Sequence, residues 1–300
     1  MNRRGDSTRF HLPGNLAAGA IGDGRGEWLE RLRGSVEALA TRWSLRFGPP
    51  FQPGGQTAWV APAEDSAGTP LVLKVLWRHY EAEHEADGLA IWAGSGTVLL
   101  HDSAMIDDQT TALLLERCWP GTALSTRPEE EQDRVIAGLL VRLWREPPPG
   151  HPLRPLSEMC AQWADEFEEV AAQSSLDPGL VAKAMTLFRE LPVSAEREVM
   201  LCTDLHAGNV LAAEREPWLV IDPKPYVGDP TYDILQHLIN CQDRLRMNPD
   251  QVLRRMTALT GLDTDRARLW LFSRCVQESI GWPWLTEVAR KLEPASPPVL

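Results

Sequence analysis

Residues 199–235 read VMLCTDLHAGNVLAAEREPWLVIDPKPYVGDPTYDIL, a mostly non-helical stretch inside a mainly helical part of the chain. In it, NVLAA, the polar turn EREP and WLVI predict a β-hairpin, because two short apolar runs flank a turn-forming segment. Asn209 stands where the first strand begins, Asp222 follows the second, and Asp204 lies five residues before Asn209. Since the start of one hairpin strand lies beside the end of the other, we expect these three side chains to converge.

Two carboxylates and an amide suit a hard cation such as Mg²⁺, which prefers oxygen ligands. Phosphoryl transfer uses this set: one Asp orients the attacking hydroxyl and accepts its proton, while a second carboxylate and an amide oxygen hold metal ions on the phosphates. The spacing Asp-x-x-x-x-Asn also matches the catalytic loop of protein-kinase-like enzymes. Singly, Asp and Asn are more often turn residues. The complete string nevertheless predicts a phosphoryl-transfer site.

The part of the chain before residue 118 predicts a small lobe dominated by antiparallel sheet. Residues 1–25 are Gly- and Arg-rich, and we expect them to be loosely ordered. A helix is expected next, because Trp28, Leu32, Val36, Leu39 and Trp43 recur at helical spacing. Further along, apolar runs and turn residues predict a loop and short strand at 50–62, strands at 70–76, 97–100 and 111–116, and a helix at 79–93.

The rest of the chain predicts a mainly helical lobe. Residues 118–128 read as a linker, because they contain Gly and two Pro. Helical periodicity is expected at 128–146, 156–173, 178–190, 230–242, 248–260 and 264–280. We therefore expect a flexible N-terminus at 1–25, a nucleotide-binding N-lobe at 26–117, and a C-lobe at 118–300 that carries the catalytic loop and substrate site.

Net charge and cysteine usage limit the kinds of binding partner that this protein can have. The net charge is −12 and the pI about 5.1, so the surface would repel nucleic acid and attract a cationic small molecule, although acidity can also serve solubility alone. Five cysteines without a CxxC motif predict neither a disulfide framework nor a zinc site, and suit a reducing cytosol. No signal peptide or membrane span is evident. We expect a cytoplasmic monomer without a membrane partner.

A nucleotide site is expected in the first lobe. Lys74 interrupts the apolar run LVLKVL, where a lysine is costly unless it is paired, and Glu81, Glu83 and Glu85 follow on the next helix. Alternatively, Lys74 reaches solvent from an edge strand. The segment PGGQT at 53–57, with Gly54, Gly55 and Gln56, lets backbone N–H groups approach phosphates, but an ordinary hairpin turn explains it equally well.

DLHAGNVL followed by VIDPKPYVGDPTYD resembles the aminoglycoside phosphotransferase superfamily, and IDPKP-x-x-GDP-x-YD resembles its streptomycin 6-phosphotransferase branch, which is grouped with hydroxyurea kinases. The resemblance runs from about residue 50 to 285. It implies an α+β, two-lobed protein-kinase-like fold that uses Mg²⁺ and ATP or GTP. The site residues that it implies are Asp204 as catalytic base, Asn209 and Asp222 as metal ligands, Glu85 as partner of Lys74, and backbone groups near Glu116 and Cys118 for the nucleotide base.

The resemblance is incomplete and leaves some roles open. Cys202 stands where the superfamily often has His. His206 either braces the loop, which we favour, or touches substrate, and Lys224 either neutralises phosphate or is a surface lysine. Asp229 and Asp233 are expected to anchor the loop and cap the following helix.

The resemblance makes streptomycin the hypothesised acceptor. Hydroxyurea or another small amino alcohol is the alternative acceptor, and a silent nucleotide-binding pseudokinase is the alternative protein. Carboxylates and tryptophans at 163–169 and 277–284 suit cationic groups, but solvated and packed side chains explain them as well, so none is assigned to the substrate.

Overall fold

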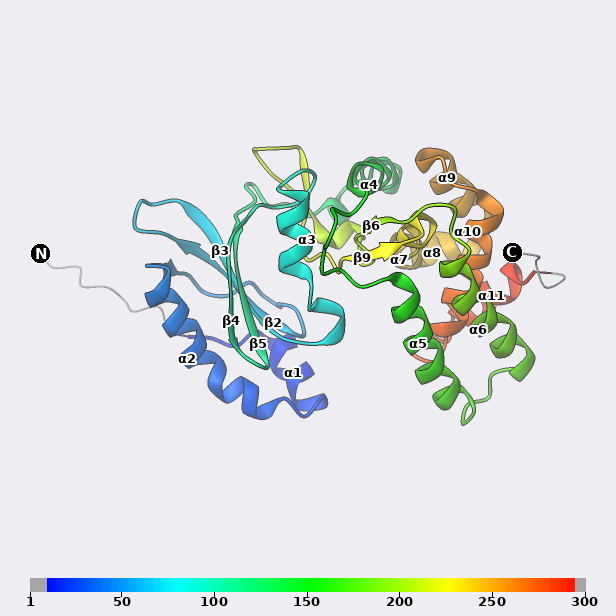
Figure 1. The fold of residues 1–300 in the computed structure, drawn as a ribbon, viewed down its shortest axis with the longest axis horizontal. Helices are drawn as coiled ribbons and strands as arrows, with labels where there is room; N and C mark the ends of the chain where they lie inside the picture. Colours follow the sequence, from blue (N-terminus) through cyan, green and yellow to red (C-terminus); the bar gives the residue numbers. More distant parts are fainter. Residues whose placement is uncertain (1–9, 295–300) are drawn as a thin grey trace, which may run out of the picture. The chain divides into compact units, whose positions relative to one another are not determined.

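The computed structural model describes residues 10–294, which form two compact units that meet in sequence between Gly121 and Thr122. Unit 1 ends at Gly121 and contains a five-stranded sheet, whereas unit 2 begins at Thr122 and is mainly helical (Figure 1). The expected combination of an antiparallel-sheet lobe with a helical lobe is confirmed.

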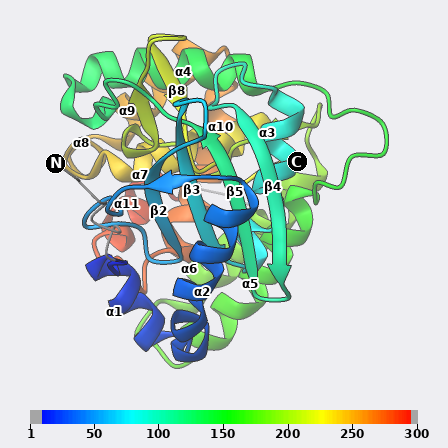
Figure 2. The ribbon, with the colours of Figure 1, turned by 90° about the vertical axis from the view of Figure 1, so that its left-hand side faces the viewer.

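The sheet of unit 1 is antiparallel throughout, with strand order β1-β2-β3-β5-β4 (Figure 2). Its strands are β1 (Arg46–Phe47), β2 (Ala58–Glu64), β3 (Pro70–Trp77), β4 (Leu100–Asp107) and β5 (Thr110–Glu116). The β1–β2 connection carries the PGGQT loop and leads directly into β2. Thr57 O accepts a hydrogen bond from Trp77 N at 2.8 Å, which places this loop beside the end of β3.

The side chains of β3 alternate between two faces of the sheet, so that the apolar core residues lie on one face and Lys74 on the other. Leu73 and Val75 are fully buried in a cluster with Leu32 and Val36 of α2 (Gly26–Arg42). Because successive strand residues point to opposite faces, Lys74 points away from α2. Its face is the one covered by α3 (Glu85–Trp92), as the two sides of the sheet in Figure 1 show.

Two sequence predictions for unit 1 are wrong. The strand expected at 97–100 is instead β4, which starts at Leu100; its residues are mostly exposed, so the apolar pattern of a buried strand is missing. Residues 1–9 lie outside the described part of the chain, but the rest of the segment expected to be loose contains helix α1 (Gly14–Gly22). Leu16 and Ala20 bury one face of α1 completely, which stabilises it despite its glycines.

Unit 2 contains the expected helices and two additional ones. The helices are α4 (Glu129–Leu143), α5 (Leu156–Ala171), α6 (Pro178–Val193), α7 (Leu235–Asn240), α8 (Gln242–Met247), α9 (Pro249–Thr260), α10 (Thr264–Gln277) and α11 (Leu285–Leu292). Two small antiparallel pairs interrupt them: β6 (Val199–Leu201) with β9 (Tyr226–Gly228), and β7 (Val210–Ala212) with β8 (Trp218–Val220). The first of the extra helices, α8, is only six residues long, and the second, α11, follows the last segment that we expected to be helical.

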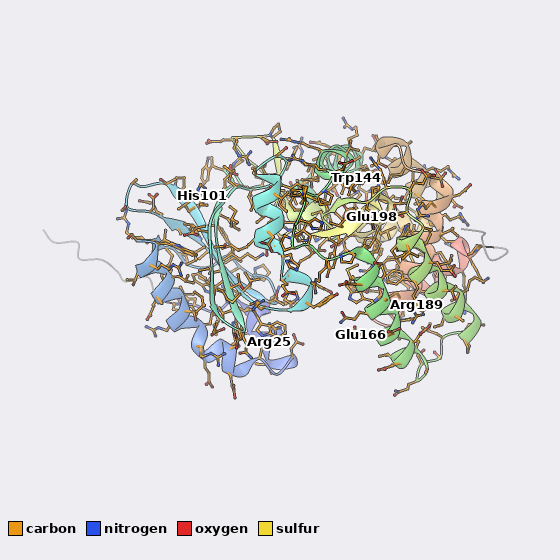
Figure 3. All side chains as sticks on the ribbon, viewed as in Figure 1. Arg25, His101, Trp144, Glu166, Arg189 and Glu198 are labelled. Atoms are coloured by element: carbon orange, nitrogen blue, oxygen red, sulfur yellow. The ribbon has the colours of Figure 1, made fainter. Side chains whose placement is uncertain are left out.

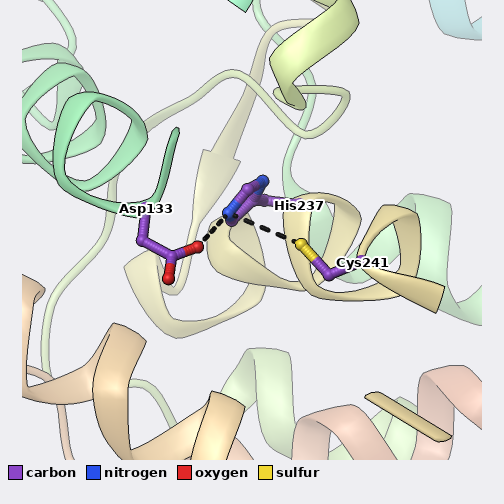
Figure 4. A group of neighbouring side chains, drawn as sticks. All are labelled: Asp133, His237 and Cys241. Carbon is purple, nitrogen blue, oxygen red and sulfur yellow. Dashed lines mark hydrogen bonds and ion pairs between the residues drawn. The ribbon is translucent and has the colours of Figure 1, made fainter. Parts of the chain in front are cut away.

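A buried ionic cluster joins four helices of unit 2. Asp133 of α4 is inaccessible to solvent and accepts hydrogen bonds from His237 at 2.9 Å, Arg244 at 2.8 and 2.9 Å, and Arg255 at 2.6 Å. One potential ligand atom from each of Asp133, His237 and Cys241 lies within 4.8 Å of the other two, which is close enough for the three to share a metal ion (Figure 4). Arg244, however, donates to both Asp133 and Cys241 Sγ, so a guanidinium already supplies the positive charge. We interpret this group as structural.

The five cysteines are free and buried, so no disulfide links the described residues. None of the helices within residues 10–294 is long and apolar enough to cross a bilayer.

Candidate active site

The β7–β8 hairpin brings the sequence-predicted residues together. Val210 pairs with Val220, and Ile221 N donates a 2.9 Å hydrogen bond to Asn209 O, so Asn209 and Asp222 lie at the same end of the hairpin. The amide of Asn209 also reaches back, because its Nδ2 lies 3.0 Å from Asp204 O and 3.4 Å from Asp204 Oδ2. With Nδ2 facing Asp204, the amide oxygen of Asn209 is the atom able to face a cation.

Asp204 is a partly buried carboxylate with a perturbed pKa. Burial raises the pKa of Asp204 to about 6, with Lys224 opposing the rise and Asp222 adding to it. Lys224 forms an ion pair with Asp222, and its side chain is only 13% exposed, so it is not the solvated surface lysine that the sequence left open. Because Asp222 already pairs with the Lys224 ammonium, its carboxylate is placed to neutralise a cation.

The backbone around these residues is held in unusual conformations. Thr203 and Asp222 have φ angles of +47° and +54°, which side chains other than glycine rarely adopt. Thr203 is held there by two hydrogen bonds: its N–H donates to Asp233 at 2.6 Å and its hydroxyl donates to Lys224 O at 2.6 Å. Strained conformations held in this way concentrate at functional sites.

Asp233 is the anchor of the loop that carries Asp204. Its carboxylate accepts from the N–H groups of Cys202 and Thr203 and from Trp144 Nε1 at 2.9 Å, where Trp144 follows α4 (Figure 3). Burial raises the pKa of Asp233 to about 6, so it is mainly ionised at neutral pH. These bonds hold the loop without a histidine at position 202. Cys202 is completely buried, and burial raises the pKa of its thiol well above its usual value.

His206 braces the loop in this structure. Its Nδ1 accepts a hydrogen bond from Gly208 N at 3.1 Å. Burial, assisted by the charge of His237, lowers the pKa of His206, which favours the neutral ring that can accept this bond. A Cβ on Gly208 would lie 2.8 Å from the His206 ring, so this close approach requires glycine.

Unit 1 forms the ion pair expected from the sequence. Lys74 Nζ lies 2.6 Å from both carboxylate oxygens of Glu85, and the side chains are 8% and 1% exposed. Lys74 therefore does not reach solvent from an edge strand, because β3 lies between β2 and β5. A buried lysine aimed by a glutamate is the arrangement that kinases use on nucleotide phosphates.

Replacing Lys74 with Met is expected to lower kcat/KM for the nucleotide by about 10²-fold, because one preorganised positive charge is removed from the phosphates. Steady-state kinetics with varied nucleotide measures this. Because the change removes the lysine partner of the buried Glu85 carboxylate, the double variant Lys74→Met/Glu85→Gln separates lost chemistry from lost folding. Lys183→Met is the matched control, since Lys183 pairs with Glu293 in unit 2 and is not among the residues predicted to contact the nucleotide. Unchanged kcat/KM in the Lys74 variant would restrict the pair to a structural role.

The other residues predicted to contact the nucleotide stay predictions, and the structure gives their surroundings. Gly54 has a φ of +78°, and the loop at 53–57 lies at the end of the sheet as a phosphate loop would. Glu116 N donates to Leu99 O at 2.9 Å, so this N–H is already used within unit 1 and is not available to a base. Cys118 is 9% exposed, and its role stays a prediction.

The carboxylates noted on the acceptor side have protein partners. Asp165 and Glu168 of α5 both pair with Arg189 of α6, and Glu278 pairs with Arg274 at 2.8 Å. Arg274 also stacks on Trp163, with its guanidinium carbon 4.6 Å from the ring centroid. These contacts favour packing and ion pairing within unit 2 over a set of spare negative charges for a cationic substrate.

Each unit by itself carries part of the residue set that a phosphotransferase with an alcohol acceptor uses: the lysine–glutamate pair in the sheet of unit 1, and Asp204, Asn209 and Asp222 in the loop of unit 2. Residues 43–283 match the family model described as aminoglycoside/hydroxyurea antibiotic resistance kinase. The chain belongs to this family.

Curated relatives support this assignment over most of the chain. A streptomycin 6-kinase of Streptomyces glaucescens is 34% identical and covers 97% of this chain and 96% of its own. A hydroxyurea phosphotransferase of Kitasatospora aureofaciens is 38% identical over 85% of this chain and 74% of its own. Identity alone therefore does not separate the two acceptors.

Solved structures share the fold at low identity. A macrolide 2'-phosphotransferase type I superposes with a TM-score of 0.55 at 18% identity, covering 88% of this chain and 97% of its own. An aminoglycoside phosphotransferase in ternary complex with ADP and hygromycin B gives a TM-score of 0.53 at 16% identity, covering 85% and 94%. These matches establish the phosphotransferase fold.

Proposed function

We propose that this protein is an aminoglycoside O-phosphotransferase that transfers the γ-phosphate of ATP or GTP to a hydroxyl of streptomycin and so confers resistance. The observation that carries the chemistry is the convergence of Asp204, Asn209 and Asp222 at one end of the β7–β8 hairpin. An intact set of this kind also favours an active enzyme over a silent pseudokinase.

In the proposed mechanism Asp204 orients the acceptor hydroxyl and takes its proton as the hydroxyl oxygen attacks the γ-phosphorus. The bond from that phosphorus to the bridging oxygen of the nucleoside diphosphate breaks in line. A carboxylate whose pKa is about 6 is ionised at neutral pH. This pKa is also close enough to neutral pH for the carboxylate to accept a proton in the transition state. Lys74, aimed by Glu85, would bind the phosphates and stabilise the charge on them.

The oxygen donors of the site fit Mg²⁺. Asn209 Oδ1 and the Asp222 carboxylate would bind the ion. The ion pair between Lys224 and Asp222 would then break, and the Lys224 ammonium would bind the phosphates instead. When bound, the ion supplies charge neutralisation across the phosphates. The ADP bound in the solved aminoglycoside phosphotransferase supports a nucleotide in the same role here.

The case for streptomycin over hydroxyurea rests on coverage. The streptomycin 6-kinase aligns with almost the full length of both chains, whereas the hydroxyurea phosphotransferase leaves about a quarter of its own length unmatched. The net charge of −12 also favours a cationic acceptor. Hydroxyurea stays the second candidate because its phosphotransferase has the higher identity over the aligned part.

Turnover of the purified chain tests this proposal. Release of nucleoside diphosphate is measured with Mg²⁺, ATP or GTP, and a panel of streptomycin, other aminoglycosides and hydroxyurea. We expect acceptor-dependent release with streptomycin. Release with hydroxyurea alone would keep the kinase and replace the acceptor. No release with any acceptor, in a protein that binds nucleotide, would favour the pseudokinase.

A further inference from the structure

The segment at residues 13–25 in unit 1 contacts the 53–57 loop through that loop's carbonyl oxygens. Asn15 uses two donors: its backbone N–H bonds Pro53 O at 3.2 Å, and its side-chain Nδ2 bonds Gly54 O at 3.0 Å. Arg25 adds a third contact, since its Nη1 lies 3.1 Å from Gln56 O. Three carbonyls of a five-residue loop thus accept hydrogen bonds from only two residues.

This arrangement determines where the N–H groups of the loop point. In a trans peptide the C=O and N–H groups point in opposite directions. The peptide bonds that follow Pro53, Gly54 and Gln56 are trans. Their N–H groups, which belong to Gly54, Gly55 and Thr57, are therefore directed away from the 13–25 segment. Within residues 10–294 none of the three donates a hydrogen bond. Adjacent N–H groups on one side of a loop form a binding site for an anion.

Close packing shows that the segment and the loop are built for each other. A Cβ on Gly54 would lie 2.5 Å from Pro13 Cβ, and its φ of +78° also requires glycine. A Cβ on Gly19 of α1 would lie 3.2 Å from Gln56 O. Gly54 is thus needed for contact with the segment as well as for the path of the loop.

Arg25 is a buried charge with specific partners. Its side chain is 3% exposed, it pairs with Asp23 at 2.6 Å, and it stacks on Trp77 with its guanidinium carbon 4.9 Å from the ring centroid. Arg25 lies below the sheet in Figure 3, beside α1. Burying a guanidinium is costly, so the packing that holds it also holds the Gln56 carbonyl in one orientation.

We propose that Asn15 and Arg25 are positioning residues that hold the 53–57 loop in the conformation that binds the phosphates of the nucleoside triphosphate. The inference rests on the proposed function, because it assigns the bound anion to the nucleotide. The family match begins at residue 43, so the 13–25 segment lies outside the region that defines the family.

The test is the dissociation constant of the full-length protein for a non-hydrolysable ATP analogue, AMP-PNP, measured by calorimetry with Mg²⁺ and without acceptor. Asn15→Ala is expected to raise it by about 2- to 10-fold, the effect of one lost hydrogen bond. Asn15→Asp is expected to raise it further, because a carboxylate repels Gly54 O. An acidic residue in the first turn of α1 suits the helix dipole, so the thermal midpoint should not fall. Arg25→Lys should show a smaller rise than Arg25→Met, because lysine keeps a donor.

The matched control is Arg33→Ala in the same N-terminal region, since Arg33 pairs with Glu37 within α2 and does not contact the loop. Its dissociation constant should equal that of the wild type. Unchanged AMP-PNP affinity in both Asn15 variants overturns the inference, whether or not their thermal midpoints fall. If the wild type itself does not bind AMP-PNP, the proposed function fails, and the inference fails with it. The two failures are therefore distinguishable.

Discussion

Replacing Asp204 with Asn is expected to lower kcat by about 10²- to 10⁴-fold, the contribution of a positioned general base. The amide is nearly the same size as the carboxylate, but it cannot accept the proton of the acceptor hydroxyl. Steady-state turnover with the best acceptor of the panel measures kcat, and calorimetry with AMP-PNP measures nucleotide affinity. Nucleotide affinity should stay within a few-fold of the wild type, because Lys74 and the 53–57 loop are unchanged.

Asp263→Asn is the matched control for this substitution. Asp263 caps α10 by accepting from Arg266 N at 2.7 Å, and Asn is an equally good cap, so neither activity nor stability should change. If Asp204→Asn keeps wild-type kcat, Asp204 is not the base, and the proposed mechanism fails while the family assignment stands.

Replacing Asp133 with Ala is expected to lower the free energy of unfolding by about 3–5 kcal/mol, the cost of leaving buried charges unpaired. Asp133 faces Arg244, Arg255 and His237. Burial acts to lower the pKa of His237, but its bonds to Asp133 and Cys241 outweigh this and raise the pKa to about 9, so all three partners are cationic at neutral pH. Urea unfolding followed by circular dichroism measures the loss.

Asp165→Ala is the control for this measurement. Asp165 also pairs with an arginine, but its side chain is 73% exposed, so removing it should cost at most about 1 kcal/mol. Equal losses in the two variants would show that burial does not set the strength of the Asp133 cluster. A loss of nucleotide affinity without a loss of stability in Asp133→Ala would contradict the structural interpretation.

The convergence of the three candidate residues in unit 2 was predictable because they are close in sequence. One hairpin separates Asn209 from Asp222, and its turn and apolar runs determine which residues end up adjacent, while Asp204 precedes Asn209 by only five positions. The Lys74–Glu85 pair was predictable for a related reason: a lysine in an apolar strand requires a partner, and the next helix offers glutamates. The edge strand β4 was missed because its exposed residues carry no apolar pattern.

The contacts that only the tertiary structure revealed join residues far apart in the chain. Arg244 and Asp133 are 111 positions apart, and Arg25 and Gln56 are 31 apart. Asp233 was expected to anchor the loop, but its bonds to the Cys202 and Thr203 amides were not predicted. Helix α1 was missed altogether, because its glycines weaken its intrinsic propensity and its stability comes from burial.

Sequence patterns alone were thus enough to predict the class of fold, phosphoryl transfer as the chemistry, and the residues that a single hairpin or strand–helix pair brings together. The pairing of the buried charges, the bonds that hold the loop carrying Asp204, and the packing of the 13–25 segment against the 53–57 loop became evident only in three dimensions. Local patterns reflect backbone preferences over a few residues, whereas a buried charge or a short helix is stable only through partners supplied by distant parts of the chain.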